Sequence, residues 1–352
     1  MADLSEQLQQ QVLDARANKR PLTIVGGHTK AFMGRQTTGQ LLNTAEHSGI
    51  INYQPVELVL TARAGTTIIE IEQALAANNQ MLAFEPPVFS ASSTIGGTLA
   101  CNLSGPARPW GGSIRDHVLG VRIINGLGEH LKFGGQVMKN VAGYDVSRLQ
   151  AGAMGSLGII TEISLKVMPK PASTATLVWD MPASEAITFI NELAGKPKPI
   201  SAMCWLQGRL YVRLSGARSA VEATIKQWQT QELTDADAFW DSLRHQQHPI
   251  FNNGLPLWRF SVNSAASMPS LDSDSLIDWG GSQRWYAGVQ DLDEMQALAA
   301  NAGGHVSLYS GGDRSADVMH RLPMTVQNIQ KRIKASFDPD HIINPGRLYS
   351  WM

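Results

Sequence analysis

Two glycine-rich loops in the first third of the chain constrain its fold more than any other feature. The first, residues 25–34, directly follows a short apolar strand at 22–25 and contains Gly26 and Gly27. The second, residues 93–105, contains a glycine pair at the start of a short helix. Glycine permits positive φ and carries no Cβ, so successive backbone N–H groups can converge on a diphosphate. Because single loops of this kind are common turns, it is their combination that indicates a phosphate site.

Side chains and helix geometry in both loops support the same interpretation. Thr29 offers a hydroxyl group and Lys30 offers a positive charge within the first loop. In the second loop, Gly96 and Gly97 open a helix whose N-terminal N–H groups are suited to an anion. We therefore expect the two loops to face one ligand.

The standard nucleotide-binding motifs are missing from the sequence. No G-x-G-x-x-G follows a strand, and no P-loop signature is present. The stretch that contains Gly126 and Gly128 fails because Leu131 occupies the place of the third glycine. A Rossmann-type oxidoreductase is therefore disfavoured.

Composition excludes several classes of function. The chain has 29 Lys+Arg against 30 Asp+Glu, a balance that provides no electrostatic footprint for nucleic acid. Its only cysteines, Cys101 and Cys204, are too few for a disulfide framework and lack the spacing of an iron–sulfur or zinc site. The first residues do not resemble a signal peptide, and no apolar run has the length of a membrane span. We expect a cytoplasmic protein that holds no metal.

Hydrophobic periodicity predicts an α+β chain. A length of 352 residues favours about two domains, and the prolines at 169 and 171 mark the boundary between them. After this boundary the strand–helix rhythm resembles two split βαβ units of the ferredoxin-like type. The expected helices are 4–18, 67–78, 184–195, 219–231, 235–247, 291–302 and 319–336; the expected strands are 22–25, 57–62, 117–124, 129–133, 158–167, 174–180, 201–207, 209–215, 256–262, 283–289 and 305–310.

Several motifs together resemble the FAD-linked oxidase family of the vanillyl-alcohol-oxidase type, whose cofactor domain is called PCMH-type. The resemblance rests on the two glycine loops and on residues 139–145, 155–162 and 338–346. Within this family, residues 110–120 and 133–145 most resemble the FAD-binding subunits of bacterial glycolate oxidases. The resemblance implies a two-subdomain FAD domain at 1–171, a ferredoxin-like cap at 172–335, and a C-terminal return to the FAD domain at 336–352.

The resemblance also implies a set of cofactor-binding residues. The first loop would hold the pyrophosphate, the second would follow the ribityl chain and flavin ring, and the stretch at 158–162 would hold the adenine. The C-terminus would return near the flavin. The residues implied are Gly26, Gly27, His28, Thr29, Lys30, Ala31, Pro86, Pro87, Thr94, Gly96, Gly97, Ala100, Asn102, Gly105, Gly158, Ile159, Ile160, Glu162, Asn344 and Arg347.

Three positions qualify this expectation. His28 stands where some relatives attach FAD covalently, but Val25 differs from the pattern of those relatives, so a non-covalent role stays open. Met154 replaces a glutamate that is common in the family, which removes a polar contact near the adenine. The His-x-Gly-Asp-Gly-Asn cluster of the 2-hydroxy-acid dehydrogenases is absent; only His305 and a later Gly-Gly-Asp at 311–313 are present. No catalytic residue can therefore be named.

The function implied is that of an FAD-binding subunit in a complex that oxidises glycolate, a small 2-hydroxy acid, to glyoxylate. Electrons would pass to partners, namely a second FAD-containing catalytic subunit and an iron–sulfur subunit. These partners would hold the chain at the periphery of the inner membrane. Two alternatives stay open: a self-sufficient FAD-dependent 2-hydroxy-acid oxidase, and a scaffold subunit that keeps the fold without firm FAD binding.

Overall fold

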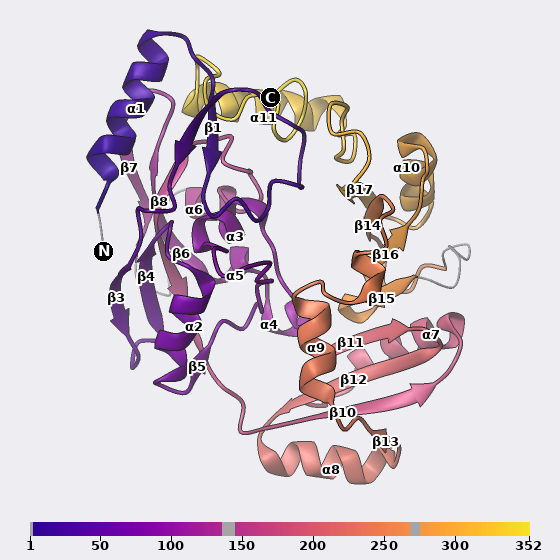
Figure 1. Cartoon of the computed structure of the whole chain (residues 1–352). Helices are drawn as coiled ribbons and strands as arrows, with labels where there is room; N and C mark the ends of the chain where they lie inside the picture. The colour runs from indigo at the N-terminus through magenta and orange to yellow at the C-terminus, as the bar shows by residue number, and fades with distance from the viewer. Residues whose placement is uncertain (1–2, 136–144, 268–274) are drawn as a thin grey trace.

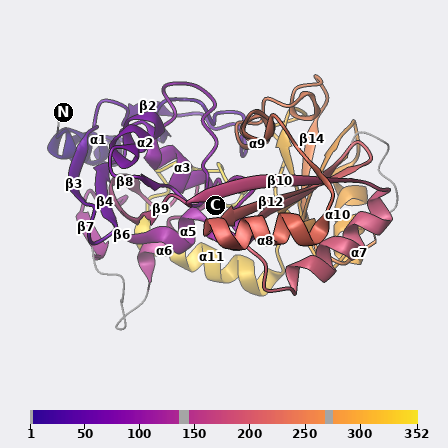
Figure 2. The same cartoon turned by 90° about the horizontal axis from the view of Figure 1, so that it is seen from below.

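The computed structural model describes residues 3–135, 145–267 and 275–352. The chain forms two α+β units, one built on a five-stranded sheet and one on an eight-stranded sheet (Figure 1). A view turned by 90° shows the units side by side, with helix α1 (Ser5–Ala17) and helix α7 (Ala183–Ala194) at opposite ends (Figure 2). Residues 139–144, which belong to the family resemblance, lie outside the described residues.

The first unit contains an antiparallel sheet in the order β3-β4-β8-β6-β7. Its face is covered by α2 (Ile68–Ala76) and α3 (Ile95–Cys101), which bury an aliphatic core against β4, β6 and β8. Helix α2 begins where the sequence predicts, because the Thr67 side chain accepts a hydrogen bond from Glu70 N. The strands are β3 (Ile50–Gln54), β4 (Val59–Arg63), β6 (Val118–Ile124), β7 (His130–Gly134) and β8 (Ile159–Lys166).

A small parallel pair of strands forms a second layer of this unit. Strand β1 (Leu22–Val25) pairs with β2 (Gln40–Asn43), and Leu22 also bridges to Ile343 near the C-terminus. Backbone hydrogen bonds from Leu22 N to Ile342 O and from Asn344 N to Leu22 O fix this second edge. The C-terminal segment therefore lies alongside β1, and α1 packs against the same layer.

The second unit is one sheet in the order β13-β10-β12-β11-β15-β16-β14-β17. Each half has the strand order of a ferredoxin-like fold, as the sequence predicts, and the halves join where β11 pairs with β15. We call this unit the cap. Its strands are β10 (Ser173–Asp180), β11 (Ile200–Leu206), β12 (Arg209–Gly216), β13 (Gln231–Glu232), β14 (Leu257–Ser261), β15 (Leu276–Asp278), β16 (Gln283–Ala287) and β17 (His305–Ser310).

The two faces of the cap sheet have different neighbours. Helices α7, α8 (Arg218–Trp228) and α10 (Leu292–Asn301) pack on the outer face. The inner face packs against α9 (Ala236–Arg244) and against the first unit, where it meets Met33, Leu103 and Met154. A group held in the first unit near these residues therefore lies below the inner face of the cap.

A contact near residue 279 fastens the cap to the first unit. The Trp279 indole N–H donates to Gly105 O at 3.0 Å, and the Arg108 guanidinium lies 4.4 Å from the centroid of the Trp279 ring system. Gly280 approaches Trp110 so closely that an added Cβ would lie 3.3 Å from the indole ring. The stretch 277–281 thus contributes to the contact between the two units.

The last helix, α11 (Met324–Phe337), begins later than the sequence predicts because Pro323 precedes its first turn. The remaining short elements are α4 (Arg108–Gly111), α5 (Ile114–His117), α6 (Val146–Leu149), β5 (Gln80–Met81), β9 (Met168–Pro169) and the 3₁₀ turns Pro249–Phe251 and Trp279–Gly281. None of the helices in the described part of the chain has the length and apolar character that a bilayer span requires.

Candidate functional site

A cavity opens at the end of β1, between the parallel pair, helix α3 and the start of β8. It brings together most residues that the sequence assigned to a cofactor, although these are widely separated along the chain. Those that line it are Gly26, Gly27, His28, Thr29, Lys30, Ala31, Thr94, Gly96, Gly97, Ala100, Gly158, Ile160, Asn344 and Arg347.

The two glycine loops can meet at one wall of the cavity because their glycines carry no side chains. A Cβ on Gly27 would lie 1.6 Å from Ser92 O, and a Cβ on Gly26 would lie 2.8 Å from Thr94 Oγ1. Ser92 Oγ donates to Gly27 O at 2.9 Å, which ties one loop to the other. The packing of the two loops therefore requires glycine at both positions.

Lys30 places an uncompensated positive charge beside these glycines. Its side chain is only 7% exposed, and a Cβ on Gly97 would lie 3.7 Å from its ammonium nitrogen. Among the described residues its only hydrogen-bond partner is Thr29 Oγ1, at 3.3 Å, and no carboxylate forms an ion pair with it. Burial lowers the pKa of Lys30. A buried cation without an acidic partner is expensive unless a ligand supplies the negative charge.

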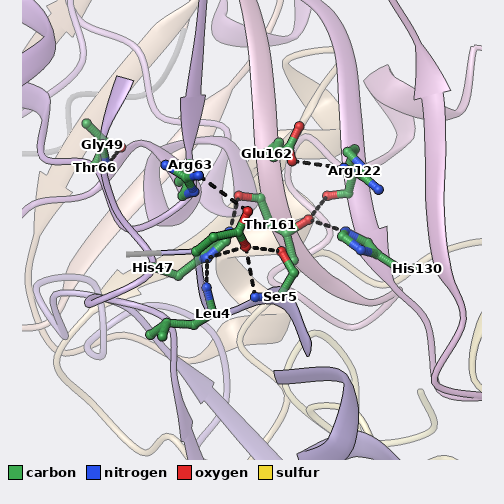
Figure 3. Close-up of polar contacts among 11 residues, drawn as sticks. Leu4, Ser5, His47, Gly49, Arg63, Thr66, Arg122, His130, Thr161 and Glu162 are labelled. Carbon is green, nitrogen blue, oxygen red and sulfur yellow. Dashed lines mark hydrogen bonds and ion pairs between the residues drawn. The ribbon is translucent and has the colours of Figure 1, made fainter. Parts of the chain in front are cut away.

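The far end of the cavity is formed by the backbone of β8 and its neighbours. Gly158 and Ile160 lie here, and the polar network beyond them holds the strand in place (Figure 3). Thr161 O accepts hydrogen bonds from Ala64 N at 2.8 Å and from the His47 ring at 3.1 Å. Thr161 Oγ1 in turn bonds to the His130 ring at 2.9 Å.

Two C-terminal residues close the cavity, as the resemblance implied. Asn344 Oδ1 accepts from Ile24 N, and Asn344 Nδ2 donates to Met154 O, each at 2.8 Å. The Arg347 guanidinium donates to Arg35 O at 2.8 Å and to Ala31 O at 3.2 Å. Both side chains therefore hold the first glycine loop in place while they contribute to the wall.

His28 is exposed and has a φ of 57°, a conformation that is uncommon for residues with a side chain. It lines the mouth of the cavity rather than its interior.

Six of the expected residues lie elsewhere. Pro86 and Pro87 are buried, and Pro86 O accepts from Arg244 of α9. Ile159 points into the core beside α1, because side chains alternate along a strand. Glu162 forms an ion pair with Arg122 at 3.1 Å (Figure 3), and Gly105 accepts the Trp279 indole N–H.

The sixth residue, Asn102, carries an unused acceptor. It ends α3 in the left-handed conformation, with a φ of 50°, and its Oδ1 is buried without a hydrogen-bond partner among the described residues. Buried polar atoms are nearly always paired in folded proteins. Its neighbours Ala100 and Cys101 line the cavity, but Asn102 itself does not.

Sequence reasoning missed several lining residues. Thr44 follows β2, a four-residue strand that the sequence pattern did not reveal, and Ala64 follows β4. Gly155 begins the stretch 155–162 of the resemblance but is not among the residues assigned to the cofactor. Val25, in the first glycine loop, and Met154, expected near the adenine, also line the cavity without having been assigned to it. The lining residues that the sequence did not indicate are Thr23, Ile24, Thr44, Ala64 and Cys101.

Comparisons with known proteins identify the family. A family model described as an FAD binding domain matches residues 2–134. The glycolate oxidase subunit GlcE of Escherichia coli K12 is 45% identical over 348 residues, which cover 99% of this chain and 98% of that protein. The chain belongs to the FAD-linked oxidase family.

Two further proteins resemble the chain less closely. The glycolate oxidase subunit GlcD of Bacillus subtilis is 37% identical and aligns with 83% of this chain and 76% of its own length. A solved structure of alkyldihydroxyacetonephosphate synthase superposes with a TM-score of 0.68 at 15% identity, over 97% of this chain and 76% of that one. At this level of identity the structural likeness shows the fold alone.

The FAD-linked oxidase cofactor, FAD, fits the cavity chemically. The glycine wall leaves room for a diphosphate beside Lys30, and the β8 backbone borders the far end. FAD is therefore the cofactor of this chain.

Proposed function

We propose that the chain is the FAD-carrying subunit of a complex that oxidises glycolate to glyoxylate. The observation that carries the proposal is the buried Lys30 ammonium, which has no acidic partner among the described residues and lies against a wall of glycines. The nearly full-length likeness to the E. coli GlcE subunit supports both the substrate class and membership of a complex.

Each part of the cavity has a distinct role in this proposal. Gly26, Gly27, Thr29 and Lys30 would hold the diphosphate, while the backbone at Gly158 and Ile160 would border the adenine. The other assigned residues, including those outside the cavity wall, would support the loops. The bound cofactor supplies the two-electron acceptor for a reaction in which glycolate loses two electrons and two protons to become glyoxylate. The cap and α3 would exclude water from the reacting end.

Partner subunits are needed to complete the reaction. Among the described residues no group of three or more His, Cys, Asp or Glu side chains is arranged to hold a metal ion. His305 is exposed, and its ring neighbour is His320 at 5.7 Å. We propose that a second FAD-containing subunit supplies the catalytic cluster and that an iron–sulfur subunit carries the electrons onward, at the inner membrane.

The division of the chain remains part of the proposal. The FAD domain would span 1–171 and the cap 172–335, with 336–352 returning to the FAD domain. The contacts of Ile343, Asn344 and Arg347 with the first unit support the last of these boundaries.

The visible absorption spectrum of the purified chain tests this proposal, followed by acid precipitation. We expect a yellow protein that releases FAD into the supernatant, because the cavity holds the cofactor through backbone and charge contacts. Colour that stays with the precipitate would identify His28 as a covalent anchor. A colourless protein that cannot be reconstituted with FAD would contradict the proposal and favour the alternative of a scaffold subunit.

A matched pair of lysine variants tests the observation itself. Lys30→Met should weaken FAD binding at least tenfold, since a charge-assisted hydrogen bond contributes about 1.5–3 kcal/mol and 1.4 kcal/mol is a factor of ten. Lys132→Met removes an exposed lysine from β7 and should bind FAD as the parent does. Fluorescence titration of the apoprotein measures the FAD dissociation constants. If they are equal for the two variants, Lys30 does not bind the diphosphate.

A further inference from the structure

Arg259 lies on the inner face of the cap sheet, above the contact with the first unit. Along β14, Trp258 and Phe260 pack against α10 on the outer face, so Leu257 and Arg259 point to the inner one. Cross-strand pairing places Arg259 between Trp285 of β16 and Ser307 of β17. It is therefore a charged residue in the layer that faces the FAD unit.

The guanidinium group of Arg259 is half-buried and has no polar partner among the described residues. It makes no hydrogen bond and no ion pair with any of them, and its ring contact is with Tyr309, at 5.3 Å from the ring centroid. Its electrostatic neighbours are Tyr309, Arg108, a second cation, and Cys101, which lines the FAD cavity. Within the described part of the chain the group therefore has donors to spare and no carboxylate paired with it.

Other arginines of this region contrast with Arg259. The Arg314 guanidinium donates to Leu308 O at 2.8 Å and to Tyr309 O at 2.6 Å. The Arg347 guanidinium donates to backbone carbonyls of the first unit. Those two guanidinium groups are used to hold the fold together, whereas the donors of Arg259 remain available.

Arg259 is one of three cations near Cys101, which lines the cavity. Burial raises the pKa of the Cys101 thiol, and Lys30, Arg347 and Arg259 act against it. The diphosphate of FAD would lie beside Lys30, and the Arg347 guanidinium is bonded to backbone carbonyls. Arg259, on the cap sheet, has neither role.

The surroundings of Arg259 hold it in one orientation. The ring of Tyr309 packs edge-on against Phe32 at 5.5 Å and against Trp285 at 4.8 Å. Gln246 Nε2 donates to the Tyr309 hydroxyl at 2.9 Å. A guanidinium over a fixed ring is preorganised, which lowers the entropy lost when it binds a ligand.

We propose that Arg259 binds the carboxylate of the 2-hydroxy acid, so that this chain contacts the substrate itself from the cap side of its FAD. The planar guanidinium matches a carboxylate through two parallel hydrogen bonds. The inference rests on the proposed function, because it assumes that a small acid reaches this chain.

Oxalate binding to the full-length chain carrying FAD tests the inference. Oxalate is a small carboxylate that cannot undergo the same oxidation, and its binding is followed by the change in flavin absorption and, in parallel, by calorimetry. We expect saturable binding to the parent, at least tenfold weaker binding to Arg259→Met, and intermediate binding to Arg259→Lys, which keeps the charge without the planar fork. Arg209→Met removes an exposed arginine of the cap and should bind oxalate as the parent does.

The outcomes separate this inference from the proposed function. If the parent binds FAD but not oxalate, or if Arg259→Met binds both as the parent does, the inference is wrong and the FAD assignment stands. If the parent binds no FAD, the proposed function fails, and calorimetry still shows whether oxalate binding depends on Arg259. Circular dichroism shows whether each variant is folded. If Arg259→Met is not folded, the comparison with the parent uses Arg259→Lys.

Discussion

At the scale of single residues, a buried ion pair determines how the C-terminal segment reaches the FAD cavity. Lys334 and Asp338 are both fully buried and lie one helical turn apart, with 2.6 Å between the ammonium nitrogen and the carboxylate. Lys334 also donates to Ser156 O and Ile343 O, so all three of its protons are used. The Asp338 carboxylate accepts from Ile343 N, which directs the chain toward β1.

Replacing Lys334 with methionine should destabilise the protein by about 3–5 kcal/mol, because Asp338 would be left as a buried, unpaired carboxylate. Urea unfolding followed by circular dichroism measures the loss. Arg332→Met changes an exposed residue of the same helix and provides the control. An unfolding midpoint for Lys334→Met equal to that of the control would show that the pair contributes little.

The residues of the cavity differ in how well the sequence reveals them. Gly26, Gly27 and Lys30 are visible because a glycine pair and a nearby cation have a local pattern with a chemical meaning. Thr44 and Ala64 have no such pattern, since each enters the wall through the folding of strands that are distant in sequence. Glu162 shows the converse case: a polar residue in the right stretch pairs with Arg122 rather than facing the cavity.

At the scale of elements, a polar network joins the start of α1 to the strand that borders the far end of the cavity (Figure 3). The buried His47 ring accepts a hydrogen bond from Leu4 N at 3.0 Å and bonds to Thr161 O at 3.1 Å. Burial is the main cause that lowers the pKa of His47, with Arg63 acting in the same direction, while Asp3 and Glu162 oppose it.

Acidification should therefore destabilise this junction. A depressed folded-state pKa means that the unfolded chain takes up a proton near pH 6.5 while the folded protein does not, so His47 contributes full stability above that pH. As pH falls below 6.5, the free energy of unfolding should decrease until the folded-state pKa is reached. His47→Gln has no titratable group at this position and should show a shallower decrease between pH 7 and 5.

Urea unfolding at several pH values measures this slope. The half-buried His130 has a lowered pKa as well, so the useful quantity is the difference between the parent and His47→Gln. His341→Asn, which alters an exposed histidine, serves as the reference and should keep the slope of the parent. Identical slopes for the parent and His47→Gln would show that His47 does not titrate with unfolding.

Elements were predictable from the sequence where periodicity extends over several residues. Strand β1, strand β17 and both halves of the cap were foreseen, because alternation and turn signals are local. Strands β2 and β15 were missed: they have four and three residues, too few for a pattern to stand out. The pairing of β11 with β15, which joins the halves into one sheet, could not be foreseen because it depends on two edges that are distant in sequence.

At the scale of the whole molecule, the proposed site lies where the two units meet. The residues that line the cavity come from the first unit and the C-terminal segment, while Arg259 and Tyr309 belong to the inner face of the cap. The contact of Trp279 with Gly105 and Arg108 keeps the two parts together. On the proposal, a cofactor bound by the first unit and an acid held by the cap would meet at this boundary.

The contact between β1 and the C-terminal segment has a consequence for biosynthesis. Strand β1 leaves the ribosome early, yet its second edge is supplied by Ile343, and two cavity residues, Asn344 and Arg347, are translated after everything else that the site requires. A nascent chain therefore cannot complete the cavity wall before these last residues have been translated. Any cofactor that bound earlier would lack their contacts.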